Sequence, residues 1–359
     1  MIVEKRDEYM TERRLDSGEL NFSSLSKYRN AIYGLCAIWI VFFHGSETFN
    51  INECEGIRMT LGLILRTGNC AVDVFMLLSG IGLYFSLSKK PKLSTFYWRR
   101  LTRIYLPYLI LIVPYLIYTC IIAEQHIDRF FKTALAINYW LGDDEPIVLW
   151  YISAVIVFYL ISPLLFKVIH YQEKNALLRT ILMVAAVVVI TIVLYHRSNA
   201  LYYLLDKALT RLAVFIIGIY MGRTVKQKRH FSPLFLIICV MIAALGVPVC
   251  GVPEVHGAYY RISCSIVGVA LTFVFAQSFV TLSKWKIDKF FNFFGAFSLE
   301  IYIATSIGRK IYEKTSWGAG HGLYKYLIFS LPFMLMAYLA YLIQKLLLRK
   351  QKPTEAPII

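Results

Sequence analysis

Long apolar runs recur along the whole chain, separated by short polar segments. Ten of them reach about twenty residues, the length at which a helix crosses the hydrocarbon core of a bilayer. They show no strand-like alternation of apolar and polar positions. The pattern predicts ten membrane-spanning helices, at residues 31–49, 69–88, 104–123, 147–169, 177–196, 202–222, 232–252, 260–282, 288–307 and 323–347.

Composition supports an all-α membrane protein rather than a soluble domain. The chain is 58% hydrophobic and only 17% charged, unlike a typical soluble protein. We expect a polar N-terminal segment over 1–28, a membrane domain over 29–348 and a tail over 349–359. No cleaved signal peptide is visible, because the first apolar run is long enough to remain as an anchor.

The distribution of basic residues predicts the orientation. About two thirds of the 38 Lys and Arg fall in segments on the same side as the N-terminus, so we expect both termini to be cytoplasmic. One loop on the opposite side departs from this trend, with Arg309, Lys310, Lys314 and Lys325. The net charge of +16 is then explained by topology and anionic lipid, and no nucleic-acid partner is expected.

The seven cysteines show neither a CxxC pair nor a spacing typical of a metal site. Most of them lie within predicted spans, where a thiol serves as a small apolar side chain. Cys54 and Cys70 both fall at the outer end of the first helical hairpin. A disulfide between them is an open alternative to two free thiols.

Four ionisable residues on four different predicted spans count out to similar depth: His44, Asp73, Arg211 and Glu300. Counted along straight helices, they all reach the outer half of the bilayer or its middle. Such residues are costly in hydrocarbon, so each is a candidate for a functional site. His44 and Asp73 lie at nearly equal depth on adjacent antiparallel spans. A carboxylate beside an imidazole is the arrangement of a general base, so we predict that Asp73 orients His44.

Each of these residues also has a structural interpretation. His44 could simply hydrogen-bond a neighbouring helix, and Asp73 could be a helix N-terminal acid favoured by the dipole. Arg211 and Glu300 could form an ion pair with each other as readily as they could contact a substrate. Trp150 and Tyr151, near the outer start of the fourth span, fit interfacial aromatics as well as substrate contacts.

Arginines gather at the predicted cytoplasmic ends of the first three spans. Arg29 precedes the first apolar run, and Arg99, Arg100 and Arg103 follow the second. Their planar guanidinium groups suit phosphate oxygens, although juxtamembrane arginines commonly contact lipid headgroups. These residues are therefore candidates for binding a phosphorylated cofactor.

Helix geometry connects the two groups of candidates. Arg29 and His44 are fifteen residues apart, ~22 Å along a helix, and Tyr33 and His44 differ by only about 20° around it. Arg29, Tyr33 and His44 should therefore line one side of the first span. A nucleotide-headed donor could bind at the cytoplasmic end and present its reactive group near His44.

Six segments of the chain resemble the acyltransferase-3 family of bacterial multi-pass membrane acyltransferases. They occur in family order, and the resemblance extends over about residues 25–348. The segments are Tyr33–His44, Ala71–Gly80, Phe96–Pro107, Leu149–Ser153, Arg211–Gly218 and Gly295–Tyr302.

The resemblance implies ten membrane helices in the bacterial inner membrane and an acyl-CoA donor, usually acetyl-CoA. The implied reaction is O-acylation of an envelope glycan or a similar hydroxylated acceptor. The family's first-helix motif is an Arg, ten residues and a His; His44 matches, but Tyr33 stands at the Arg position. Arg29, one turn earlier, could substitute. The family's Arg-x-x-Arg pattern corresponds to Arg100 and Arg103.

We therefore expect an acetyl-CoA-dependent O-acyltransferase that uses no metal. The expected catalytic residues are His44, Asp73 and Glu300. The expected donor-binding residues are Arg29, Tyr33, Arg99, Arg100 and Arg103, and the expected substrate-binding residues are Trp150, Tyr151 and Arg211. The alternatives are a transporter or flippase of an anionic or glycan substrate and, less favoured, a scaffold subunit. The sequence leaves open the acceptor, the acyl chain length, the oligomeric state and an acyl-His44 intermediate.

Overall fold

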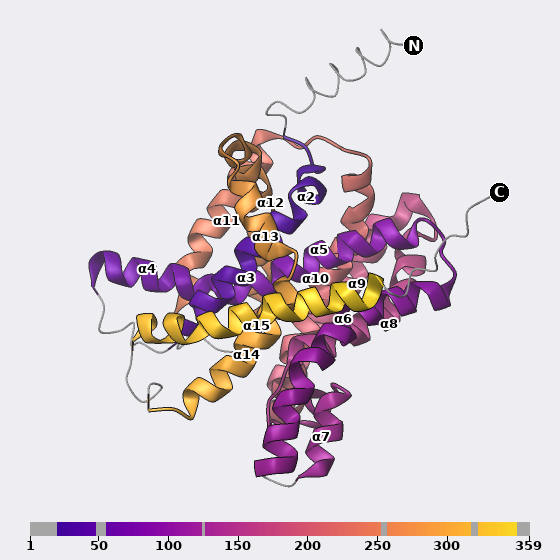
Figure 1. The fold of residues 1–359 in the computed structure, drawn as a ribbon. Coiled ribbons are helices and arrows are strands. Elements are labelled where there is room, and N and C mark those ends of the chain that lie inside the picture. Colours follow the sequence, from indigo (N-terminus) through magenta and orange to yellow (C-terminus); the bar gives the residue numbers. More distant parts are fainter. Residues whose placement is uncertain (1–19, 48–54, 124–125, 253–256, 317–321, 350–359) are drawn as a thin grey trace, which may run out of the picture.

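The chain folds into a bundle of helices (Figure 1). The computed structural model describes residues 20–47, 55–123, 126–252, 257–316 and 322–349, and these contain no strand, only one isolated bridge. The helices, in chain order, are α2 (Ser24–Lys27), α3 (Arg29–Ser46), α4 (Gly56–Arg66), η2 (Thr67–Cys70), α5 (Ala71–Leu87), α6 (Leu93–Leu116), η3 (Ile117–Ala123), α7 (Ile127–Ala134), η4 (Asn138–Leu141), α8 (Trp150–His170), η5 (Glu173–Asn175), α9 (Ala176–Arg197), α10 (Asn199–Lys226), α11 (Pro233–Gly251), α12 (Ala258–Leu282), η6 (Ser283–Trp285), α13 (Ile287–Gly295), α14 (Ser298–Glu313) and α15 (Leu323–Arg349).

The all-α membrane fold is confirmed, and each predicted span lies on a helix. Among the described residues, seven helices are long and apolar enough to cross a membrane, or up to eight if one bent pair counts as a span. The other two predicted spans, α3 and α10, are continuous helices that carry more charged and polar residues. The count of ten, the cytoplasmic termini and the domain limits remain predictions. Most of 1–28 and 349–359 lies outside the described residues.

The ninth predicted span is broken, and this changes the position of its glutamate. Residues 288–307 were expected to form one straight helix, but α13 and α14 meet at an angle of 65°. Gly295 ends α13, and a Cβ there would collide with the backbone oxygen of Asn30 in α3. Because α13 packs so closely on α3, the chain turns after Gly295, and Glu300 falls in the first turn of α14.

Helices α5 and α10 form the centre of the bundle and pack in parallel with a constant register. Lys226 donates a hydrogen bond to Ser88 across an offset of 138 residues. The same offset relates Gly80 to Gly218, whose backbones touch, and Asp73 to Arg211, which form an ion pair. One face of each helix therefore meets the other from the ion pair at one end to Ser88 at the other.

Two glycines allow this close approach. A Cβ on Gly80 would collide with the backbone oxygen of Phe215, and one on Gly218 with that of Leu77. In a bilayer, where lipid is as apolar as the protein, close packing of small residues is a main source of helix association. The close α5–α10 contact therefore requires glycine, which has no Cβ, at both positions.

Gly80→Ala or Gly218→Ala should push α5 and α10 apart. Because the obstacle is backbone rather than a flexible side chain, we expect a loss of about 1–3 kcal/mol in stability. The measurement is the apparent unfolding temperature of the purified protein in detergent. Ala200→Leu, a larger change at an exposed position of α10, is the control. Equal unfolding temperatures for the glycine variants and the wild type would contradict the close-packing argument.

Candidate active site

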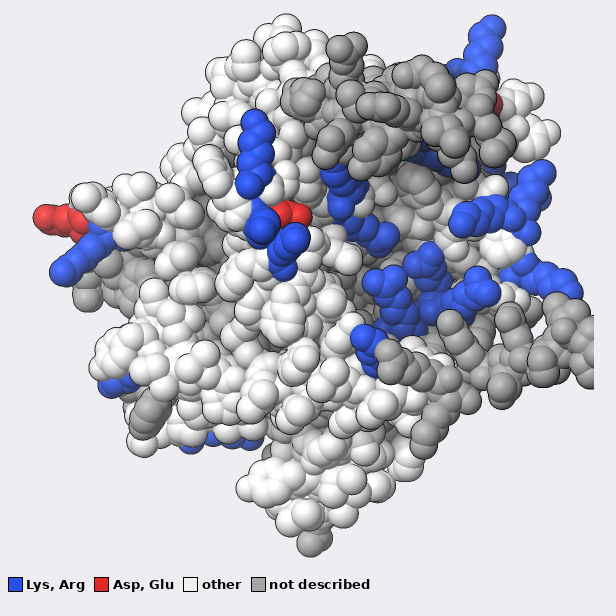
Figure 2. Space-filling model, turned by 45° about the horizontal axis from the view of Figure 1, so that its top comes forward, with Lys and Arg blue, Asp and Glu red and all other residues white. Residues whose placement is uncertain are grey.

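A large cavity opens between α3, α5, α6, α8, α14 and α15, and we call it the arginine cavity. Its volume is about 640 Å³, within the range of ligand-binding clefts. All five residues predicted to bind the donor line it, together with two other site candidates: Arg29, Tyr33, Arg99, Arg100, Arg103, Tyr151 and Glu300. Lys and Arg side chains gather on one side of the molecular face drawn in Figure 2.

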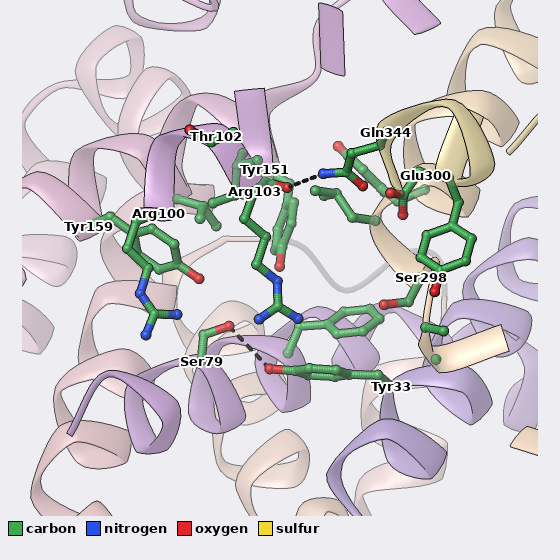
Figure 3. Close-up of a pocket in the computed structure, with 18 of the residues that line it drawn as sticks. Tyr33, Ser79, Arg100, Thr102, Arg103, Tyr151, Tyr159, Ser298, Glu300 and Gln344 are labelled. Atoms are coloured by element: carbon green, nitrogen blue, oxygen red, sulfur yellow. Dashed lines mark hydrogen bonds between the residues drawn. The ribbon is translucent and has the colours of Figure 1, made fainter. Parts of the chain in front are cut away.

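The arginines of this cavity are held by aromatic side chains. Arg29 donates hydrogen bonds to the Tyr33 hydroxyl from Nε (3.2 Å) and Nη2 (3.1 Å), and its guanidinium lies against Gly82, where a Cβ would collide with it. Arg100 lies 5.8 Å from the ring centre of Tyr159. Figure 3 shows Arg103 extending from α6 into the cavity. The contact of Arg29 with Tyr33 fits the expectation that Arg29 acts from one turn earlier.

A second cavity surrounds His44, and we call it the histidine cavity. Its volume is about 550 Å³. Many of its lining side chains are polar or charged: His44, Glu47, Arg66, Asn69, Lys207, Tyr260, Arg261 and Arg309. Trp150 also lines it. A polar cavity at a residue predicted to lie within a membrane span is the setting expected of a functional site.

Glu47 and Arg309 surround the imidazole of His44. The Nδ1 atom lies 2.9 Å from Glu47 Oε2 and 2.7 Å from Arg309 Nη1, and those two residues form an ion pair at 2.9 Å. Nδ1 cannot donate a hydrogen bond to Glu47 and accept one from Arg309 at the same time. The tautomer of His44 therefore decides which of the two hydrogen bonds forms. Donation to Glu47 leaves Nε2 as the proton acceptor that a general base requires.

The charge state of Glu47 favours this arrangement. Its Oε2 atom forms an ion pair with Arg309 at 2.9 Å, and a neighbouring cation favours the ionised form of a carboxyl group. The carboxylate can then accept the proton on Nδ1. Neither Glu47 nor Arg309 was predicted from the sequence as a partner of His44. The spacing of three between His44 and Glu47 at a helix end could have indicated the first.

The predicted pairing of His44 with Asp73 is wrong. Asp73 is fully buried and contacts Arg211, whose Nη2 lies 3.5 Å from Oδ2, and the Ser265 hydroxyl donates to Oδ1 at 2.9 Å. Equal depth on two helices did not ensure contact, because α5 turns Asp73 toward α10 rather than toward α3. Whether Asp73 has a catalytic role stays a prediction.

Arg211 connects this ion pair to the histidine cavity. It is completely buried, its Nη2 donates to Asn69 Oδ1 at 3.5 Å, and its guanidinium lies 5.3 Å from the ring centre of Trp150. Asn69 and Trp150 both line the histidine cavity. The alternative pairing of Arg211 with Glu300 is also wrong, because Arg211 pairs with Asp73.

Glu300 lies in the arginine cavity and not beside His44. The four ionisable residues therefore do not converge on one site. The reason is the bend between α13 and α14, which places Glu300 at the start of a helix instead of twelve residues along one. In Figure 3 it lies across the cavity from Arg100, on the side of Ser298 and Gln344.

Only a thin wall separates the two cavities. On α3, Ile40 lines the arginine cavity and Phe43 the histidine cavity; on α8, Tyr151 lines the first and Trp150 the second. Three residues of helix rise by ~4.5 Å, so along α3 the linings of the two cavities are about one helical turn apart. The two cavities are therefore neighbours along the same helices.

The chain matches a known protein family. A family model described as an acyltransferase domain matches residues 30–343, nearly the whole chain. The chain belongs to the acyltransferase-3 family. No curated protein and no solved structure matches it. It is therefore a membrane acyltransferase, in agreement with its helices that are long and apolar enough to cross a membrane.

Arg211→Ala should strongly destabilise the acyltransferase, because it leaves the Asp73 carboxylate buried without its partner. Breaking one side of a buried ion pair typically costs about 3–5 kcal/mol, whereas replacing both sides with apolar groups costs far less. The double variant Asp73→Leu/Arg211→Met should therefore unfold at a higher temperature than the single variant. Lys132→Met, which breaks an exposed pair with Asp128, should have no measurable effect. A double variant as unstable as the single would contradict the ion-pair account.

Proposed function

We propose that this acyltransferase is an O-acetyltransferase that moves an acetyl group from cytoplasmic acetyl-CoA to a hydroxyl of an envelope glycan. The donor would bind in the arginine cavity and the acceptor in the histidine cavity. One observation carries the proposal: the two cavities approach within about one helical turn along α3 and α8. Acetyl as the acyl group, a glycan as acceptor and the bacterial inner membrane rest on the family resemblance.

The charge of the arginine cavity supports a phosphorylated donor. Its lining contains five cationic side chains and one carboxylate: Arg29, Arg99, Arg100, Arg103, Lys345 and Glu300. The diphosphate and ribose phosphate of coenzyme A would be complementary to this charge. Trp98, which also lines the cavity and is 66% exposed, offers a ring on which an adenine can stack.

The chemistry proposed for the histidine cavity is direct acyl transfer. His44 Nε2 takes the proton of the acceptor hydroxyl, and the oxygen attacks the carbonyl carbon of the thioester. The C–S bond then breaks, and the proton on His44 passes to the departing thiolate of coenzyme A. Glu47, in place of the predicted Asp73, stabilises the protonated imidazole. A covalent acyl-His44 intermediate is the open alternative within the same reaction.

The acyl-carrying arm of the donor would cross the wall between the two cavities at a group of aromatic rings that contact one another. Phe75 contacts both Tyr33 and Tyr151, with ring centres 5.3 Å and 6.2 Å apart, and Tyr151 contacts Tyr302 at 5.2 Å. Rotation of these rings would admit a thin chain while excluding the bulky nucleotide. Nothing among the described residues favours the transporter alternative.

His44→Ala should abolish acyl transfer, because the acceptor hydroxyl loses its base. We expect kcat to fall by about 10²–10⁴-fold, with donor binding unchanged. The measurement is acetylation of acceptor glycans in membranes that contain equal amounts of each variant. His196→Ala, at an exposed histidine that contacts Tyr259, is the control, and Glu47→Gln should give an intermediate rate. Wild-type acetylation by His44→Ala would disprove the proposed role.

Arg100→Ala and Arg103→Ala should weaken donor binding. A hydrogen bond to a charged group contributes about 1.5–3 kcal/mol, so we expect the Kd for coenzyme A to rise about 10–150-fold for each variant. Calorimetric titration of the purified protein with coenzyme A gives this value. Arg229→Ala, an exposed arginine that does not line the cavity, should leave the Kd unchanged. An unchanged Kd for both cavity variants would show that these arginines contact lipid instead.

A further inference from the structure

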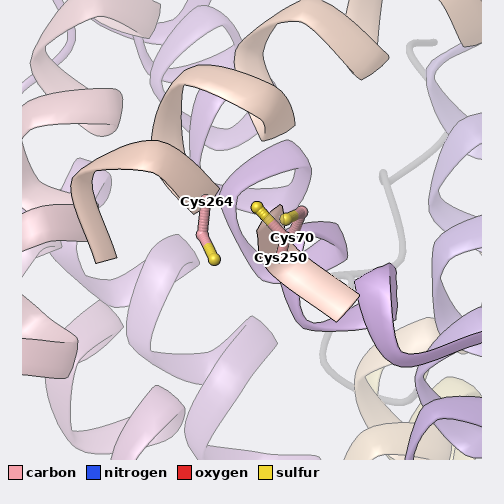
Figure 4. Close-up of side chains that lie close together, drawn as sticks. All are labelled: Cys70, Cys250 and Cys264. Carbon is pink, nitrogen blue, oxygen red and sulfur yellow. The ribbon is translucent and has the colours of Figure 1, made fainter. Parts of the chain in front are cut away.

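Three cysteines that are far apart in the sequence converge in the core. Cys70 ends η2, Cys250 lies in the last turn of α11, and Cys264 lies in α12. Their sulfur atoms all lie within 4.8 Å of one another, and all three residues are at most 1% exposed (Figure 4). Sequence spacing gave no sign of this cluster, because the three residues come from three separate elements.

A buried thiol by itself needs no explanation, since cysteine is a common small apolar side chain. Three sulfurs that come from three elements and lie within 4.8 Å of one another are different, because together they make a ligand set for a soft metal ion. Thiolate ligands select Cu⁺ and Zn²⁺ over harder cations. With metal–sulfur bonds of ~2.3 Å, ligand sulfurs stand ~4 Å apart. Small side-chain rotations would therefore bring the cluster to this distance.

The surroundings of the cluster would stabilise thiolates. Asn69 donates an N–H to the Cys264 sulfur at 3.8 Å and another to the Tyr260 hydroxyl at 3.3 Å. The Tyr260 hydroxyl in turn donates to the backbone oxygen of Cys250 at 3.1 Å. The buried cation of Arg211 donates to Asn69 at 3.5 Å. Such groups around the ligands orient a metal site and balance its negative charge.

The cluster adjoins the histidine cavity. Cys250, Asn69 and Tyr260 all line that cavity, and Cys250 carries one of the three sulfurs. A small movement of these side chains would open the cluster to an ion and to water from the cavity, and would let the thiol protons leave.

We propose that Cys70, Cys250 and Cys264 bind one soft cation, Zn²⁺ or Cu⁺. Binding forms three metal–sulfur bonds and releases three thiol protons to water in the histidine cavity, without any change of oxidation state. Cu⁺ is satisfied by three sulfurs, whereas Zn²⁺ takes a water from the cavity as its fourth ligand. The ion would tie η2, α11 and α12 together beside the acyl-transfer site. This proposal does not depend on the donor or the acceptor.

Metal titration of the purified full-length protein tests the proposal. The protein is prepared in detergent with a reductant and a chelator, then dialysed separately against Zn²⁺ and against Cu⁺. We expect about one equivalent of bound metal per chain and a higher unfolding temperature in at least one of the two. Whichever ion is retained identifies the site as a zinc or a copper site. No bound metal with either ion would overturn the proposal.

Cysteine variants distinguish metal binding at this cluster from metal binding elsewhere on the protein. Cys250→Ser and Cys264→Ala should each lose the bound metal, whereas Cys239→Ser, a buried cysteine on the same helix as Cys250, should retain it. Thiol titration of the wild type prepared without reductant, after denaturation and removal of metal, should count all seven cysteines. A count lower by two, with a matching mass difference and with linked peptides that contain two of the three cluster cysteines, would show a disulfide in the cluster and overturn the proposal. Because both wild-type measurements are independent of the variants, misfolding of a variant leaves the test intact.

Discussion

The close parallel contact of α5 and α10 is the constraint on which the rest of the structure depends. At Gly80 and Gly218 the two backbones touch, and two turns away Asp73 and Arg211 form a completely buried ion pair. A buried charge is tolerable in a bilayer only when it is paired. The register of the two helices is therefore fixed twice, by shape at the glycines and by charge at the ion pair.

This contact organises both cavities. Arg211 extends from the ion pair to Asn69 and to the ring of Trp150, which are two walls of the histidine cavity. The other face of α5 presents Ser79 to Tyr33 and Gly82 to the guanidinium of Arg29, at the arginine cavity. A shift of α5 by one turn would therefore disturb the donor-binding residues and the surroundings of His44 together.

Hydropathy predicted the helices well, because an apolar run of bilayer length has few alternatives to a helix. Charge and helix periodicity, which are local properties, grouped Arg29, Tyr33 and Arg100 as donor-binding candidates, and all three line the arginine cavity. The errors came from contacts between helices. Asp73 was assigned to His44 by depth alone, and Glu300 was misplaced because no local signal revealed that close packing of Gly295 on α3 would bend the chain.

The same distinction explains why Glu47 and Arg309 were missed. Both lie near the C-terminal ends of their helices, where charged residues are ordinarily solvated. Only the fold shows that α14 brings Arg309 to the imidazole of His44, 265 residues earlier in the chain. The pairing of Arg309 with Glu47 also limits the flexibility of both side chains. An imidazole held between a carboxylate and a guanidinium keeps a fixed orientation. If the donor and the acceptor are to meet, Nε2 of His44 must face the wall that the histidine cavity shares with the arginine cavity.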